Sequence, residues 1–219
     1  MRPRTILFDL DGTLVDSAPD LAAAANELRA RHGLQALPLQ AYRPRAGSGA
    51  RGMLAVGFGL SPQEPGYAAT RQAFLTLYAQ RLLRSTTVFA EVLPLLAEIE
   101  SRSCAWGVVT NKALGLAEPL LCGLALRQRL SVLVCGDCTP HLKPHPAPLL
   151  EAARRLDQPP EQCIYIGDDE RDMRAGRAAG MITLAAAWGY LGPDPKLHEW
   201  EADGILRSPG DLLKWLEMP

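Results

Sequence analysis

The chain has 219 residues, of which 47% are hydrophobic, and its formal net charge is −1 at pH 7. This length suffices for one α/β domain with an inserted segment, and no stripe of Lys and Arg indicates binding to nucleic acid or anionic lipid. No apolar run reaches the ~20 residues that cross a bilayer, so we expect small-molecule partners, a cytoplasmic location and no membrane contact.

The five cysteines are an odd number in a chain that is long enough to build a full core, which favours free thiols in a reducing compartment. The composition leaves the oligomeric state open, and we expect a monomer or a weak homodimer.

Five apolar runs without alternation predict strands that are buried on both faces of a parallel sheet. They are residues 5–8, 106–109, 132–135, 163–166 and 182–185. Helical patterns lie between the later runs, at roughly 90–101, 114–122, 147–156 and 171–179. This alternation predicts a doubly wound, Rossmann-like α/β fold, in which function gathers at the carboxyl ends of the strands.

The first strand is followed by Asp9-Leu10-Asp11-Gly12-Thr13, and an extended backbone would point Asp9 and Asp11 the same way. Two such carboxylates at ~4 Å repel by about 4 kcal/mol at an effective dielectric of ~20, so the pair implies a cation or a shared proton. Gly12 permits a sharp turn whose N–H groups can hold phosphate oxygens. A turn without a further role is the competing interpretation.

Residues 16–87 interrupt the alternation, because they carry helix signals and no strand-like run. Ser17 can cap a helix with Pro19 in its first turn, and a second helix is expected over 67–83. We therefore predict a catalytic core of residues 1–15 and 88–219 with an inserted α-helical cap of residues 16–87.

A Gly-rich stretch, residues 45–52, lies between these two helices and contains Ser48 and Arg51. It has two interpretations, a flexible loop or a segment that closes over a ligand.

Three later strand ends carry groups suited to a phosphate or a metal ion. Thr110 and Asn111 follow the second strand and offer a hydroxyl and an amide to phosphate oxygens. Lys143 follows the third strand, before Pro144, and its ammonium can offset negative charge. The fourth strand leads into Gly167-Asp168-Asp169-Glu170-Arg171-Asp172, which offers the hard oxygen ligands that Mg²⁺ prefers.

Together these segments resemble the four motifs of the haloacid dehalogenase superfamily. The insertion after the first motif resembles the α-helical cap of its phosphoglycolate-phosphatase-like branch, of which Gly176-Arg177-Ala178-Ala179-Gly180 is also typical. Within that branch the chain is most similar to a bacterial subgroup that acts on N-acetylmuramic acid 6-phosphate. The segments that carry this similarity are Gly49-Ala50-Arg51, Trp106 to Lys112, Gly167-Asp168-Asp169 and Trp188-Gly189-Tyr190.

The resemblance implies a Mg²⁺-dependent phosphatase for a small phosphate monoester, with N-acetylmuramic acid 6-phosphate as first choice and 2-phosphoglycolate as second. It implies that Asp9 attacks phosphorus and forms an aspartyl-phosphate, while Asp11 protonates the leaving alkoxide and then deprotonates a water. The implied metal ligands are the carboxylates of Asp9 and Asp168 and the backbone carbonyl of Asp11. The residues with supporting roles are Asp169 and Asp172 behind the metal, Thr110 and Lys143 at the phosphoryl group, and Thr13, Asn111, Ser48 and Arg51 toward the substrate.

Four alternatives remain at this point. A dehalogenase is disfavoured because relatives with that activity lack the second Asp of motif one. A sugar phosphomutase would use the same aspartyl-phosphate, and a ligand sensor would use the same scaffold without turnover. Cys135 and Cys138, followed by His141 and His145, have a zinc-like spacing, although Lys143 of the same loop is expected in the active site.

Overall fold

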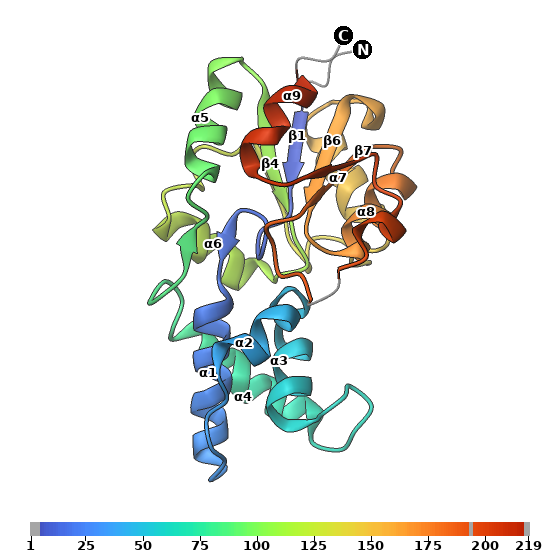
Figure 1. The fold of residues 1–219 in the computed structure, drawn as a ribbon. Coiled ribbons are helices and arrows are strands. Elements are labelled where there is room, and N and C mark those ends of the chain that lie inside the picture. The colour runs from blue at the N-terminus through green and yellow to red at the C-terminus, as the bar shows by residue number, and fades with distance from the viewer. Residues whose placement is uncertain (1–4, 193–194, 217–219) are drawn as a thin grey trace.

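A six-stranded parallel sheet forms the centre of the molecule. The computed structural model describes residues 5–192 and 195–216, and the strand order within them is β5-β4-β1-β6-β7-β8 (Figure 1). The strands are β1 (Thr5–Phe8), β4 (Ala105–Val109), β5 (Val132–Val134), β6 (Cys163–Gly167), β7 (Ile182–Ala186) and β8 (Gly204–Leu206). The parallel, doubly wound fold predicted from the sequence is therefore confirmed.

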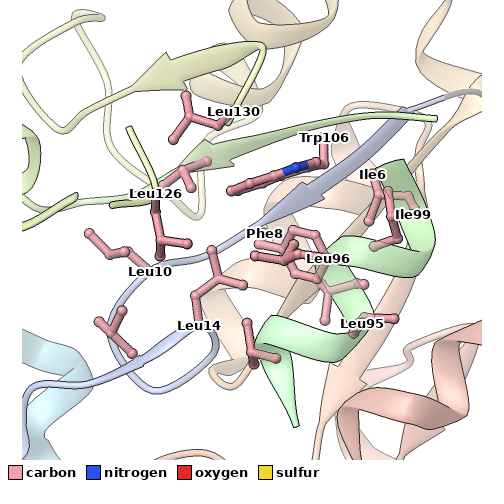
Figure 2. Close-up of a cluster of buried hydrophobic side chains, with 14 of the residues drawn as sticks. Ile6, Phe8, Leu10, Leu14, Leu95, Leu96, Ile99, Trp106, Leu126 and Leu130 are labelled. Carbon is pink, nitrogen blue, oxygen red and sulfur yellow. The ribbon is translucent and has the colours of Figure 1, made fainter. Parts of the chain in front are cut away.

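Both faces of the sheet are buried, which explains why its strands have no apolar–polar alternation. In β1, Ile6 and Phe8 pack on one face and Leu7 on the other. Figure 2 shows Ile6, Phe8 and Trp106 packed against residues of α5. The first face is covered by α5 (Val92–Ser101), α6 (Leu114–Gly123) and α9 (Leu212–Leu216), and the second by α7 (Ala147–Arg155) and α8 (Glu170–Ala178).

The helical insertion, residues 16–87, has a hydrophobic cluster of its own. It is built from α1 (Ala18–Arg31), α2 (Leu39–Tyr42), α3 (Gly49–Phe58) and α4 (Tyr67–Ala79). Side chains such as Leu21, Met53 and Phe74 are at most 3% exposed within this cluster. A two-stranded antiparallel pair, β2 (Val15–Asp16) with β3 (Thr87–Val88), joins the two ends of the insertion. Figure 1 places α1 to α4 beyond the carboxyl ends of the sheet strands.

The Gly-rich stretch does not form a flexible loop. Its first part lies in a 3₁₀ helix, Arg43–Ser48, and its second part begins α3. Gly52 makes this possible, because a Cβ there would lie 2.1 Å from the carbonyl oxygen of Arg45. The second predicted helix also ends earlier than expected, at Ala79, and Leu83 adopts a positive φ of 71°. Among the described residues, none of the helices has the length and apolar character needed to cross a membrane.

Candidate active site

Groups from β1, β4 and β6, or from the residues that follow them, surround Lys143, which lies in the loop after β5. Its ammonium donates to Asp9 Oδ1 at 2.7 Å and lies 2.7 Å from Asp172 Oδ1. It also donates to the hydroxyl of Tyr165 at 2.6 Å and to the carbonyl oxygen of Val109 at 3.0 Å. Since the Lys143 side chain is 3% exposed, this charge acts in a site largely shielded from water.

Three buried carboxylates, those of Asp9, Asp168 and Asp172, form an acidic cluster. One oxygen from each lies within 4.8 Å of the others. Burial raises the pKa of Asp9 to about 6, against the opposing effect of Lys143. Burial, followed by the charges of Asp9 and Asp172, raises the pKa of Asp168 well above its usual range. The cluster thus holds more negative charge than Lys143 balances, and hard oxygen donors in this arrangement fit Mg²⁺.

Asp168 is held from two sides by the chain around it. The Thr13 hydroxyl donates to Oδ1 at 3.0 Å, and the backbone N–H of Tyr190 donates to Oδ2 at 2.7 Å. A Cβ on Gly12 would lie 2.1 Å from Oδ2, and one on Gly189 would lie 2.2 Å from the Asp168 Cβ. The structure therefore places Thr13, expected toward the substrate, on a carboxylate of the acidic cluster.

Asp11 lies apart from this cluster, because its side chain is directed toward the helical insertion. The Ser17 hydroxyl donates to Asp11 Oδ1 at 2.5 Å, and Lys112 Nζ donates to both carboxylate oxygens at 3.1 Å. Ser17 was expected to cap α1, but its side chain makes no capping hydrogen bond. The hydroxyl of Tyr190 accepts instead from the backbone N–H groups of Ser17 and Ala18, at 2.6 and 2.9 Å.

Thr110 and Asn111 lie in the same region, with their side chains bonded to the backbone. The Asn111 amide donates to the carbonyl of Lys143 at 3.1 Å and accepts from its N–H at 3.0 Å. The Thr110 hydroxyl accepts from the N–H of Lys112 at 3.2 Å. Asn111 therefore fixes the loop that carries Lys143.

Asp169 and Asp172 support the site from the start of α8. Asp169 forms a two-pronged pair with Arg171, at 2.7 Å for each prong, and accepts from its backbone N–H. Arg171 also donates to the carbonyl of Gly47 in the insertion at 3.0 Å. Asp172 accepts from Tyr165 at 3.1 Å and from the N–H of Asp169 at 3.2 Å.

Ser48 and Arg51 are not joined to the acidic cluster by any hydrogen bond or ion pair of the described chain. Ser48 precedes α3, and Arg51 lies exposed in its first turn. The zinc-like cysteines and histidines do not form a metal-binding group either, since the acidic cluster is the sole such group within residues 5–192 and 195–216.

Three residues of this site were assigned no role from the sequence, namely Tyr165, Lys112 and Tyr78. Tyr190, which follows the fifth predicted strand, was expected either to line the substrate entrance or to cover the sheet. Tyr165 stands in an otherwise apolar strand, and a buried phenol needs a hydrogen-bond partner. The sequence alone could therefore have indicated that Tyr165 has a buried polar partner. The contact of Lys112 with Tyr78 of α4 depends on how the insertion packs, which no local pattern encodes.

Known proteins of one family are similar to this chain over nearly its whole length. The family model of haloacid dehalogenase-like hydrolases matches residues 6–186. A phosphoglycolate phosphatase of Xanthomonas campestris pv. campestris is 45% identical over 215 residues, covering 96% of this chain and 95% of that protein. An N-acetylmuramic acid 6-phosphate phosphatase of Pseudomonas aeruginosa is 41% identical over 217 residues, covering 99% and 96%. The crystal structure of a predicted phosphoglycolate phosphatase from Haemophilus somnus has a TM-score of 0.86 at 26% identity, covering 98% of each chain.

Proposed function

We propose that this chain acts through an aspartyl-phosphate on Asp9 with the help of Mg²⁺. The basis is that the chain belongs to the haloacid dehalogenase-like hydrolases and is a phosphatase of small phosphate esters. The observation that carries the proposal is the position of Asp9, a buried carboxylate beside Lys143 and next to Asp168. A carboxylate in this setting can attack phosphorus while the ammonium balances the charge that gathers on the transferred group.

In this mechanism the Asp9 oxygen displaces the alcohol and the bond from phosphorus to the leaving oxygen breaks. Asp11 gives the leaving oxygen a proton, and then takes a proton from the water that hydrolyses the intermediate. Lys143 stays protonated, because the charges of Asp172 and Asp9 outweigh burial and raise its pKa. We expect the Thr110 hydroxyl to bond a phosphate oxygen. The N–H groups of Gly12 and Thr13 are already used inside the turn, where they donate to the carbonyl oxygens of Val15 at 2.9 Å and Leu10 at 3.4 Å.

The residues proposed to hold Mg²⁺ are Asp9 and Asp168 through their carboxylates and Asp11 through its backbone carbonyl. Bound there, the ion supplies positive charge to the phosphoryl oxygens. Asp172 is expected behind these ligands, since Lys143 and Tyr165 already occupy its carboxylate. We also propose that residues 16–87 act as a cap over the site, in accord with their separate hydrophobic cluster.

For the substrate we propose N-acetylmuramic acid 6-phosphate first and 2-phosphoglycolate second. Relatives of similar identity carry each name, so overall similarity alone does not choose between them. The ranking rests on Gly49-Ala50-Arg51 and Trp188-Gly189-Tyr190, which resemble the subgroup that acts on N-acetylmuramic acid 6-phosphate.

Phosphate release from a panel of monoesters with Mg²⁺ tests this proposal. We expect turnover of one or both named esters by the wild-type protein. Asp9→Asn should lower the rate by about 10³-fold or more, because an amide of nearly the same shape is a poor nucleophile. Circular dichroism of the variant serves as the folding control. Wild-type turnover by Asp9→Asn would refute the covalent mechanism, and no turnover of any monoester by the wild type would refute the substrate class.

A further inference from the structure

Lys112 makes a contact network that the proposed chemistry does not use. Its ammonium donates to both carboxylate oxygens of Asp11 at 3.1 Å and to the hydroxyl of Tyr78 at 2.8 Å. Lys112 is thus bonded to Asp11 on the core side and to Tyr78 of α4 on the insertion side.

The pair is buried between the core and the helical insertion. The Lys112 side chain is 7% exposed and that of Asp11 is 15% exposed. Tyr78 of α4 is 1% exposed, and its ring centroid lies 4.6 Å from Lys112 Nζ. Burial lowers the pKa of Lys112, but Asp11 and Tyr78 outweigh this effect, so the pKa is raised and the charge is kept.

Both side-chain contacts of Asp11 lead into the insertion. One partner, Ser17, directly precedes α1, and the other, Lys112, is bonded to α4 through Tyr78. The orientation of the Asp11 carboxylate thus depends on how the insertion lies against the core.

Building on the proposed function, we propose that Lys112 is a positioning residue that aligns Asp11 for proton transfer, and that Tyr78 makes this alignment conditional on the contact of α4 with the core. Proton transfer to a leaving group requires that the acid lie within hydrogen-bond reach of the departing oxygen. With α4 in contact, Lys112 holds Asp11 at a fixed position. Without α4, water competes for the ammonium and the carboxylate is free to rotate.

The test compares two substrates with different needs for an acid. An alkyl phosphate, either of the two esters named above, needs a proton on its leaving oxygen, whereas p-nitrophenyl phosphate does not. For Lys112→Met we expect kcat on the alkyl ester to fall about 10²-fold and kcat on p-nitrophenyl phosphate to fall less than about threefold. The kcat ratio is defined here as kcat on the alkyl ester divided by kcat on p-nitrophenyl phosphate. Tyr78→Phe, which keeps the ring but removes the hydroxyl, should lower this ratio by about 10-fold.

A matched control is Tyr42→Phe, since Tyr42 is also a buried tyrosine of the insertion but its hydroxyl bonds to Asn26 at 3.1 Å. Its kcat ratio should equal that of the wild type. In an Asp11→Asn background, Lys112→Met should add less than about threefold, because the group that it positions is gone. Equal losses on both substrates, or a full added loss in that background, would overturn the positioning role.

Two further results decide the link to the insertion. A wild-type kcat ratio in Tyr78→Phe would show that the alignment of Asp11 does not depend on the contact of α4 with the core. Hydrogen exchange should be faster in residues 67–79 of Lys112→Met than of the wild type, and unchanged exchange would contradict the contact. If the wild-type protein turned over neither ester, the proposed function would fail, and the exchange measurement would still decide the contact of Lys112 with α4.

Discussion

Among single residues, Lys143 is notable because its buried ammonium pairs with two buried carboxylates. Its ammonium pairs with Asp9 and Asp172, each at 2.7 Å, and its side chain is 3% exposed. Removing one member of a buried ion pair leaves the other charge uncompensated, which is far more costly than removing an exposed pair. Lys143 should therefore matter for stability as well as for turnover.

We predict that Lys143→Met lowers the free energy of unfolding by about 3–5 kcal/mol at pH 7, because the carboxylates then repel without a counter-charge. Urea denaturation measures this change. The matched control is Lys214→Met, because the ion pair of Lys214 with Asp211 has the same 2.7 Å length but the Lys214 side chain is 80% exposed. It should cost less than about 1 kcal/mol. Similar losses in the two variants would mean that burial does not strengthen the pair.

Arg51 lies exposed in the first turn of α3, where it could reach a bound substrate. If it contacts the organic half of the substrate, Arg51→Ala should lower kcat/KM at least about 10-fold for the physiological ester and leave p-nitrophenyl phosphate nearly unchanged. Arg45→Ala is the control, because Arg45 is also exposed and lies in the same stretch. Equal behaviour of the two variants on both substrates would show that Arg51 is an ordinary surface residue.

The sequence predicted Asp9 and Asp168 because each directly follows a buried strand and offers a carboxylate to phosphate or metal. Lys143 was predicted from its cationic side chain before Pro144, in the loop after the third strand. Their partners were harder to predict. Ser17 has the local signature of a helix cap, yet its hydroxyl bonds to Asp11, six residues earlier in the chain. One side-chain hydrogen bond here replaces another that the sequence favours equally.

Among helices and strands too, elements with a clear local sequence pattern were predicted, and elements that depend on packing were not. The central strands form apolar runs and were predicted, whereas β8 has three residues at the sheet edge and gives no such run. Helix α3 contains Gly49, Gly52 and Gly57, which are poor helix formers. Gly52 is required by the close approach of Arg45, so packing explains a helix that propensity disfavours.

Tyr190 joins the start of α1 to the acidic cluster. Its hydroxyl accepts from the first N–H groups of α1, while its backbone N–H donates to Asp168. We predict that Tyr190→Phe lowers the free energy of unfolding by about 1–2 kcal/mol, because two buried N–H groups lose their acceptor. Hydrogen exchange should accelerate at Ser17 and Ala18. Unchanged exchange there would mean that water replaces the phenol at no cost.

At the scale of the whole molecule, the acidic cluster sets the balance between stability and function. Asp168 is buried beside two other carboxylates, and its raised pKa records how unfavourable its ionised form is there. A carboxyl with a raised pKa destabilises the folded state as pH rises above the lower pKa of the unfolded chain, because the unfolded chain ionises more easily, and the loss is complete above the pKa of the folded state. A bound cation offsets this effect because it favours the ionised, folded form.

Mg²⁺ should consequently raise the thermal stability of the whole chain, even without substrate. Binding to the folded state alone stabilises it by about 2.7 kcal/mol at a free concentration of 100 times Kd, which corresponds to a rise in Tm of roughly 5–10 °C for a chain of this size. Asp168→Asn should abolish the rise, because it removes a proposed ligand and part of the charge that the ion offsets. Asp211→Asn, which alters a carboxylate of the surface pair with Lys214, should keep the rise in Tm.

Differential scanning fluorimetry with a Mg²⁺ titration, after chelation of the purified protein, measures the rise in Tm for the wild type and for both variants. A full rise in Asp168→Asn would place the ion elsewhere, and no rise in the wild-type protein would contradict Mg²⁺ binding at the acidic cluster.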